Sequence, residues 1–273
     1  MAKFDENALT QAVIDSLGPD ADPRVRQISA SLIRHLHAFI RDIEPTQEEW
    51  QDAIDFLTRT GQTCTPVRQE FILLSDALGA SMLVDAINHR LPSKATHSTV
   101  LGPFFVSDAP RVPSGAMISR PEDGPPLRIE GSVASVTGEP LQGAVVEIWH
   151  CDESGFYDVQ KDPQTLNGRA SVVTDAQGRF MVRSVVPSFY PIPDDGPVGD
   201  MLHAQGRHPF RPAHVHFKIS AQGYRSLTTH LFPAADPYLN SDVVFGVKDS
   251  LIVELTHAEQ TTVLQHDFTL AAN

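Results

Sequence analysis

The chain has 273 residues, of which 41% are hydrophobic, and 34 acidic against 21 basic residues give a net charge of −13. This apolar content suffices for one large or two smaller packed domains, and the acidic balance disfavours nucleic acid and anionic membranes as partners. No run approaches 18 apolar residues and the first residues lack a secretory pattern. We therefore expect a cytoplasmic protein without membrane insertion, with Cys64 and Cys151 reduced.

The first hundred residues are predicted to be helical. Four stretches have apolar side chains at helical spacing: residues 9–17, 25–40, 50–57 and 71–88. Asp22 precedes Pro23 as an N-cap precedes a first-turn proline, and Thr46 with Glu49 forms a capping box. Thr65-Pro66 opens the last stretch. These signals indicate a helical domain over residues 1–100.

After residue 100 the pattern changes to short runs of strand-forming residues. The runs are residues 127–133, 144–149, 171–174, 179–186, 214–220, 226–232, 249–255 and 261–268. Turn sequences such as 137–140 (TGEP) separate them. The pattern predicts an α+β chain whose second domain, residues 101–273, is an antiparallel β-sandwich. A long loop between Val186 and Arg211 is expected to be functional.

A His-x-His pair, His214 and His216, lies within one of these runs. Side chains alternate along a strand, so both imidazoles are expected on the same face, as half of a metal site. The other such pair, His35 and His37, lies in a predicted helix. There the two side chains point about 200° apart and cannot share an ion.

Two of the four tyrosines, Tyr157 and Tyr190, lie in proline- and glycine-flanked loops and are candidates to complete the site. A buried phenol with one hydrogen bond is the alternative interpretation. A set of two imidazoles and two phenolates would favour Fe(III) over Fe(II). Arg211, three residues before His214, is either a surface ion-pair partner or a fixed positive charge that stabilises negative charge on a bound ring.

This ordered set of residues resembles the intradiol ring-cleaving dioxygenases, in the branch that acts on catechol, chlorocatechol and hydroxyquinol. The resemblance covers nearly the whole chain. It includes the N-terminal helices, residues 101–105 (LGPFF), residues 138–152 (GEPLQGAVVEIWHCD) and residues 211–232 (RPAHVHFKISAQGYRSLTTHLF).

The resemblance implies an enzyme that binds one Fe(III) per chain through Tyr157, Tyr190, His214 and His216. Tyr190 would leave the metal when an aromatic diol or triol binds as a dianion. Arg211 would stabilise carbanion character while O₂ attacks the ring, which then opens between its two oxygen-bearing carbons.

Within the family, the chain is most similar to the hydroxyquinol branch, which implies cleavage of 1,2,4-trihydroxybenzene to 3-hydroxy-cis,cis-muconate or maleylacetate. Leu73 and Asp76 fall where this branch places residues near the third hydroxyl, and His230 stands where catechol enzymes usually carry glutamine. A ring hydroxyl, a backbone cap or an arginine is the expected partner of Asp76. The other residues expected in the substrate pocket are Val100, Gly102, Pro103, Phe104, Ile192, Pro193, Arg211 and Val244.

Catechol or chlorocatechol is the alternative substrate. A non-catalytic, prealbumin-like binding module without iron is the alternative from another class, because such modules also carry the pattern of residues 137–149. The apolar helix stripes exceed what one sandwich edge can cover, so we expect a homodimer through the N-terminal helices. The resemblance further implies a phospholipid in an apolar tunnel at the dimer interface.

Overall fold

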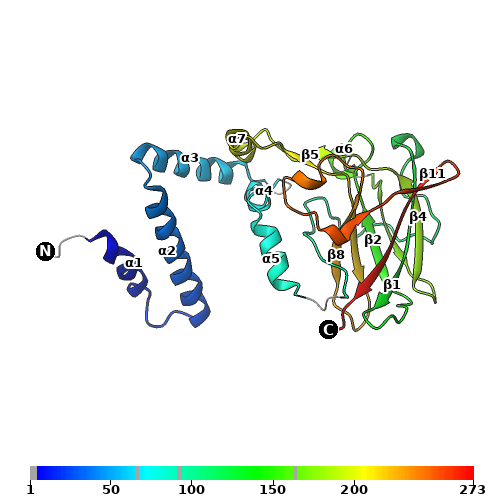
Figure 1. Cartoon of the computed structure of the whole chain (residues 1–273), viewed down its shortest axis with the longest axis horizontal. Coiled ribbons are helices and arrows are strands. Elements are labelled where there is room, and N and C mark those ends of the chain that lie inside the picture. The colour runs from blue at the N-terminus through cyan, green and yellow to red at the C-terminus, as the bar shows by residue number, and fades with distance from the viewer. Residues whose placement is uncertain (1–4, 66–67, 91–93, 163–164) are drawn as a thin grey trace. The chain divides into compact units, whose positions relative to one another are not determined.

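A computed structural model describes residues 5–65, 68–90, 94–162 and 165–273 (Figure 1). The chain divides into a first compact unit, Met1–Gln62, and a second, Thr63–Asn273. The domain boundary expected at residue 100 stays a prediction. None of the helices within the described ranges has both the length and the apolar character needed to cross a membrane.

The first unit is helical, as its periodicity predicts. Its elements are α1 (Glu6–Asp15), α2 (Pro23–Ile43) and α3 (Gln47–Thr63). Asp22 caps α2 by accepting the backbone N–H groups of Arg24 and Val25 at 2.9 and 3.0 Å. Thr46 and Glu49 form the expected capping box, each side chain accepting the other's backbone N–H at 3.2 and 2.8 Å.

The second unit begins with two helices where the sequence suggests one stretch. They are α4 (Glu70–Ala77) and α5 (Ala80–Asn88). Gly79 separates them with φ of 73°, a left-handed conformation that ends one helix before the next begins. Pro66, expected to open the stretch, lies outside the described residues. Short helices α6 (Asp158–Lys161) and α7 (Pro197–Ala204) follow later in the chain.

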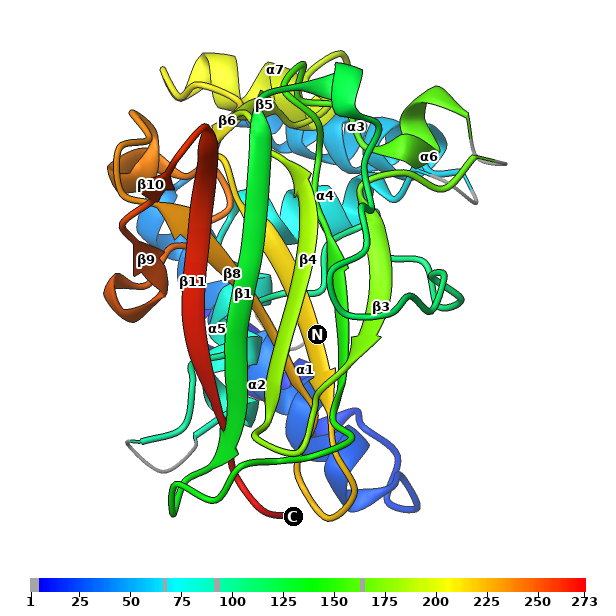
Figure 2. The ribbon, with the colours of Figure 1, turned by 90° about the vertical axis from the view of Figure 1, so that its right-hand side faces the viewer.

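The rest of the second unit is a β-sandwich with 3₁₀ turns at Pro121–Asp123, Leu239–Ser241 and Asp249–Leu251. One sheet has the order β10-β11-β1-β4 and the other β3-β2-β7-β8-β9. Figure 2 shows β11, β1 and β4 side by side in front of the second sheet. The strands of the two sheets together are β1 (Pro126–Ser135), β2 (Val145–Trp149), β3 (Arg169–Val173), β4 (Arg179–Val185), β7 (Val215–Ser220), β8 (Leu227–Pro233), β9 (Ile252–Val253), β10 (Thr256–Ala258) and β11 (Thr261–Leu270).

The prediction of a purely antiparallel sandwich is wrong in one respect, because the sheets are mixed. β1 pairs with β11 in parallel over Leu127–Ser135, and β8 pairs with β9 in parallel. β11 is the last strand and reaches β1 from far along the chain, so no hairpin turn forces the two strands to run in opposite directions.

The long segment between Val186 and Arg211 is not a structureless loop. It contains α7 and the first strand of a third, two-stranded sheet, β5 (Tyr190–Pro191) paired with β6 (Phe210–Arg211). Strands of two residues are too short to leave a periodic pattern in the sequence. Their pairing sets Tyr190 directly opposite Arg211.

The main core lies between the two large sheets and consists of side chains that alternate inward along the strands. Its fully buried members include Leu127, Ile129, Val146, Ile148, Val182, Phe217, Ile219, Leu231 and Phe268. This packing supports the sheet that contains β2, β7 and β8, and these three strands carry Trp149, His216 and His230.

Candidate metal centre

Four of the residues expected to bind metal converge in the second unit. His214 directly precedes β7 and His216 lies within it, so strand alternation sends both imidazoles to one side. Tyr157 immediately precedes α6, and Tyr190 lies in β5. All four side chains are buried.

The four donor atoms lie at separations that suit one shared ion. Tyr157 Oη is 3.0 Å from His216 Nε2, 3.3 Å from His214 Nε2 and 3.5 Å from Tyr190 Oη. His214 Nε2 is 3.1 Å from His216 Nε2 and 3.5 Å from Tyr190 Oη. Ligands bound at about 2.1 Å would lie about 3.0 Å apart at adjacent octahedral positions and about 3.4 Å apart in a tetrahedron.

Neighbouring groups orient the two histidines. His214 Nδ1 lies 2.7 Å from the carbonyl oxygen of Pro212. A proton on Nδ1 satisfies that carbonyl and leaves the Nε2 lone pair facing the other donors, as in metal-bound histidines. The His216 ring stacks on Trp149, its partner across the β2–β7 ladder, with centroids 4.6 Å apart.

Burial opposes charge on every one of these groups when no cation is present. Burial raises the pKa of Tyr157 well above its usual value, and the nearby Tyr190 adds to the shift. Burial also raises the pKa of Tyr190, although the positive charge of Arg211 opposes the shift. The pKa values of His214 and His216 are lowered well below 6.5, mainly by burial. The histidines are therefore neutral donors, and only a strongly charged cation would favour the phenolates.

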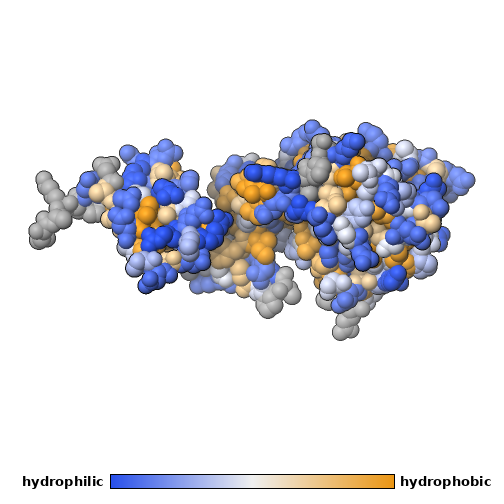
Figure 3. Space-filling model, turned by 90° about the horizontal axis from the view of Figure 1, so that it is seen from below, coloured by the Kyte–Doolittle hydropathy of each residue, from blue (hydrophilic) through white to orange (hydrophobic). Residues whose placement is uncertain are grey.

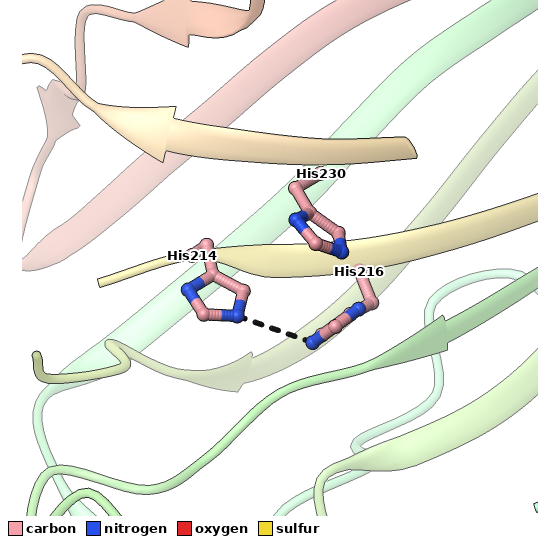
Figure 4. Close-up of side chains that lie close together, drawn as sticks. All are labelled: His214, His216 and His230. Atoms are coloured by element: carbon pink, nitrogen blue, oxygen red, sulfur yellow. Dashed lines mark hydrogen bonds between the residues drawn. The ribbon is translucent and has the colours of Figure 1, made fainter. Parts of the chain in front are cut away.

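A third histidine completes a compact imidazole cluster. His230 pairs with His216 across the β7–β8 ladder, and its donor atoms lie within 4.8 Å of those of His214 and His216 (Figure 4). Burial lowers the pKa of His230 well below 6.5, and a hydrogen bond with the backbone of Val100 opposes that shift. The sequence assigns His230 to the substrate pocket, whereas the cluster also makes it a rival metal ligand.

Arg211 is buried beside the donor atoms rather than lying on the surface. Its Nη1 is 3.2 Å from His214 Nε2, and its Nε is 3.2 Å from Asp242 Oδ1. Burial is the largest single effect and lowers the pKa of Arg211, but Asp242, Tyr190 and Tyr157 together outweigh it and leave the pKa raised. Sequence reasoning missed Asp242, because an acidic residue 31 positions away carries no spacing signal.

Glycines allow the backbone to approach the donor side chains. At Gly102, φ is 78° and a Cβ would lie 3.0 Å from His216 Cε1. At Gly155, φ is 80° and a Cβ would lie 2.9 Å from Tyr190 Cβ. The expected pocket residue Gly102 therefore lies directly beside a metal-ligand candidate, and larger residues would be strained at both positions.

The other expected pocket residues differ in their surroundings. Leu73, Ile192 and Val244 pack in one apolar cluster. Phe104 stacks on Tyr157 with centroids 4.4 Å apart. Val100 is half-buried, whereas Pro103 and Pro193 are exposed. A cavity of about 440 Å³ is lined by Gly206–His208, Leu239–Val243, Phe245 and Val247, so it contains none of the expected pocket residues.

Asp76 is half-buried on α4. Burial raises its pKa, while a hydrogen bond with Ser81 and the positive charge of Arg211 oppose that shift. The charge of Asp242 raises it further. Asp76 is thus close enough to Arg211 and Asp242 to be influenced by both.

Comparison with known proteins covers the whole chain. Residues 22–96 match the family model described as catechol dioxygenase N terminus, and residues 100–272 match the model described as dioxygenase. A hydroxyquinol 1,2-dioxygenase of Rhizobium sp. is 47% identical, over 98% of this chain and 96% of that protein. A 6-chlorohydroxyquinol 1,2-dioxygenase of Cupriavidus pinatubonensis is 48% identical over 99% of each chain. The solved structure of hydroxyquinol 1,2-dioxygenase from Pseudomonas putida matches with a TM-score of 0.94 at 46% identity, over 98% of this chain and 99% of that one.

The buried histidines predict that the iron-free protein is sensitive to acid. The pKa values of His214, His216 and His230 are lowered in the folded state. Below about pH 6.5 these histidines therefore bind protons in the unfolded chain but not yet in the folded one. The free energy of unfolding falls with pH until the lowered folded pKa values are reached. Each extra proton bound by the unfolded chain contributes a slope of about 1.4 kcal/mol per pH unit.

Chemical denaturation of the iron-free protein between pH 7.5 and pH 5 measures this slope. His230→Gln should make the dependence shallower, whereas His35→Gln, on the exposed surface of α2, should leave it unchanged. An identical slope for the wild type and His230→Gln would contradict the prediction.

Proposed function

The chain belongs to the intradiol ring-cleaving dioxygenases, since two models of this family together match nearly its whole length, and on that premise we propose that it cleaves hydroxyquinol with O₂. The product would be 3-hydroxy-cis,cis-muconate or its tautomer maleylacetate. The convergence of Tyr157, Tyr190, His214 and His216 beside Arg211 is the observation that carries the proposal. A non-catalytic binding module has no need of such a buried donor set.

We assign Tyr157, Tyr190, His214 and His216 as the ligands of one Fe(III) per chain. Five of the six separations among the four donor atoms are 3.0–3.5 Å. Two phenols with two imidazoles suit a hard trivalent ion. Ferric iron, when bound, supplies the Lewis acidity that draws in the diol oxygens and activates the ring towards O₂.

The side chains around this centre have separate tasks. Tyr190 leaves the cluster as the diol enters, and its phenolate accepts a substrate proton at Oη, since burial makes it a strong base. Arg211 directs Nη1 at the donor atoms and stabilises negative charge that develops on the ring. Leu73, Ile192 and Val244 supply an apolar wall that excludes water.

Hydroxyquinol is preferred over catechol because of Asp76. The carboxylate of Asp76, on the apolar helix α4, has no arginine within ion-pair distance among the described residues. The third hydroxyl of hydroxyquinol would donate a hydrogen bond to it. The relatives named above act, by their names, on hydroxyquinol or 6-chlorohydroxyquinol, which supports this substrate class.

Oxygen uptake with hydroxyquinol, catechol and 4-chlorocatechol, measured side by side, tests the proposal. We expect the highest kcat/KM with hydroxyquinol, together with formation of the ring-opened product. A higher kcat/KM with catechol or 4-chlorocatechol would move the assignment to those branches, and no uptake with any diol would reject it.

Removal of a phenolate ligand should abolish both colour and turnover. Tyr157→Phe keeps the aromatic ring that stacks on Phe104 but removes the donor oxygen. The visible charge-transfer band of a phenolate-bound ferric ion and the oxygen uptake should both disappear. Tyr238→Phe, outside the donor set, is the matched control and should retain both. A coloured, active Tyr157→Phe protein would contradict the ligand set.

Asp76 should set the preference for the third hydroxyl. Asp76→Leu leaves that hydroxyl unpaired and should cost hydroxyquinol about 1–3 kcal/mol of transition-state stabilisation while sparing catechol. The ratio of the two kcat/KM values measures the effect. Asp76→Asn keeps an acceptor oxygen and should retain part of the preference. A ratio unchanged in Asp76→Leu would show that Asp76 does not contact the substrate.

We also propose that the first unit forms a homodimer. Figure 3 shows apolar side chains among the polar ones on its surface. The exposed apolar residues of α2 and α3 are Val25, Ile28, Leu32, Leu36, Phe39, Ile40, Ile43, Trp50, Ile54 and Leu57. A two-fold interface between helices is the commonest way to bury such a surface. The phospholipid and the cytoplasmic location expected from the sequence stay predictions.

The dimer can be disrupted selectively. Leu32→Glu places a charge at a position that is 63% exposed in the isolated chain. It should convert a dimer at micromolar concentration into a monomer, measured by light scattering. Gln27→Glu, a polar exposed position on the same helix, should leave the mass unchanged. A single-chain mass for the wild type would reject the dimer.

Mass spectrometry of an organic extract of the purified protein tests separately for the expected phospholipid.

A further inference from the structure

The guanidinium of Arg211 is held along one edge by Asp242. Nε donates to Oδ1 at 3.2 Å and Nη2 donates to Oδ2 at 3.4 Å, and both side chains are buried. The remaining nitrogen, Nη1, lies 3.2 Å from His214 Nε2. The carboxylate therefore occupies two of the three nitrogens and leaves the third directed at the donor atoms.

Asp242 is itself fixed by the turn that follows it. Its Oδ1 accepts the backbone N–H of Val244 at 3.3 Å, and its Oδ2 accepts that of Gly246 at 2.9 Å. Its carbonyl accepts the N–H of Phe245 at 3.0 Å. Phe245 has φ of 59°, a left-handed conformation that bulky residues rarely adopt. Contacts around the turn, rather than the preference of Phe245, must maintain this conformation.

Arg207 fastens the same turn to α4. Its Nη1 donates to the carbonyl of Ala77 at 2.7 Å and its Nη2 donates to that of Val243 at 2.9 Å. Its guanidinium also lies 5.1 Å from the centre of the Phe245 ring. The helix that carries Asp76 and the turn that carries Asp242 are thereby joined, which limits the movement available to Asp242.

We propose that Asp242 is the positioning residue for Arg211, setting the direction in which the guanidinium faces the reacting ring. This inference rests on the role proposed above for Arg211. Asp242 acts through Arg211 and does not touch the substrate. Its loss should leave metal binding intact and remove the contribution of Arg211 to the transition state, because small misplacements of a catalytic group lower kcat strongly.

Asp242→Asn is the first test, since it preserves shape and one acceptor oxygen but places an amide against the guanidinium. With hydroxyquinol as substrate we expect kcat to fall about 100-fold while KM, iron content and the visible band change little. Glu130→Gln removes one negative charge from a partly exposed ion pair with Arg128 and should change none of these quantities. An unchanged kcat in Asp242→Asn would overturn the proposal.

A double-mutant cycle separates positioning from a general structural role. In the Arg211→Ala background, Asp242→Asn should cause no further loss of kcat, because the group through which it acts is absent. Losses that multiply in the double variant would show that Asp242 acts independently of Arg211 and would overturn the proposal.

Gly246→Ala provides a test that keeps both charges. A Cβ at this position would lie 3.0 Å from Arg211 Nη2 and 3.1 Å from Asp242 Oδ2, so it should displace the pair. We expect the same fall in kcat at nearly unchanged KM, even if Asp242→Asn fails to fold. A kcat equal to that of the wild type would count against the proposal.

A crystal structure of Asp242→Asn, or of Gly246→Ala if the former does not fold, gives a readout that does not depend on turnover. The distance from Arg211 Nη1 to His214 Nε2 should increase from the present 3.2 Å, by about 1 Å in Asp242→Asn and by a few tenths of an ångström in Gly246→Ala. An unmoved guanidinium would overturn the proposal even if hydroxyquinol is the substrate. A displaced guanidinium in a protein that cleaves no diol would uphold the positioning role and reject the proposed function alone.

Discussion

Two phenol oxygens and two imidazole nitrogens are held close together in the interior of the second unit, where none of them readily carries a charge. Burial raises the pKa values of Tyr157 and Tyr190 and lowers those of His214 and His216. Without a cation, the phenols keep their protons and the two imidazole Nε2 atoms lie 3.1 Å apart, at hydrogen-bond distance. A trivalent ion would reverse this balance by favouring both phenolates and using both lone pairs. The surrounding structure is arranged to keep these four atoms together.

The fold supplies this arrangement through strand pairing. The β2–β7–β8 ladders align Trp149, His216 and His230 in one row, and the sandwich core fixes those strands. The small β5–β6 sheet pairs the backbone of Tyr190 with that of Arg211, which places a candidate ligand beside the neighbouring cation. Asp242 then determines which edge of the guanidinium is free. The residues proposed to set selectivity lie on other elements, with Asp76 on α4 and an apolar cluster from three segments, so under this proposal substrate preference can change without altering the donor set.

Much of this architecture could be predicted from local patterns. The helix caps at Asp22 and Thr46 and the alternation that places His214 beside His216 depend only on nearby residues, and the structure contains all of them. Contacts between distant segments left no local signal. The parallel pairing of β1 with β11 and the ion pair between Arg211 and Asp242 depend on how the sheets pack, so neither could be predicted. Gly79 was visible within an apolar helical stretch, but only the left-handed turn shows that it divides two helices.

The identity of the donor set is the central claim, since His214 and His216 belong both to the proposed ligand set and to the cluster with His230. Anomalous diffraction from crystals of the iron-loaded protein, measured on both sides of the iron absorption edge, locates the ion directly. We expect one peak per chain within bonding distance of Tyr157 Oη, Tyr190 Oη, His214 Nε2 and His216 Nε2, with His230 outside that distance. A peak bound by the three histidines and not by the tyrosines, or no iron peak between these residues, would contradict it.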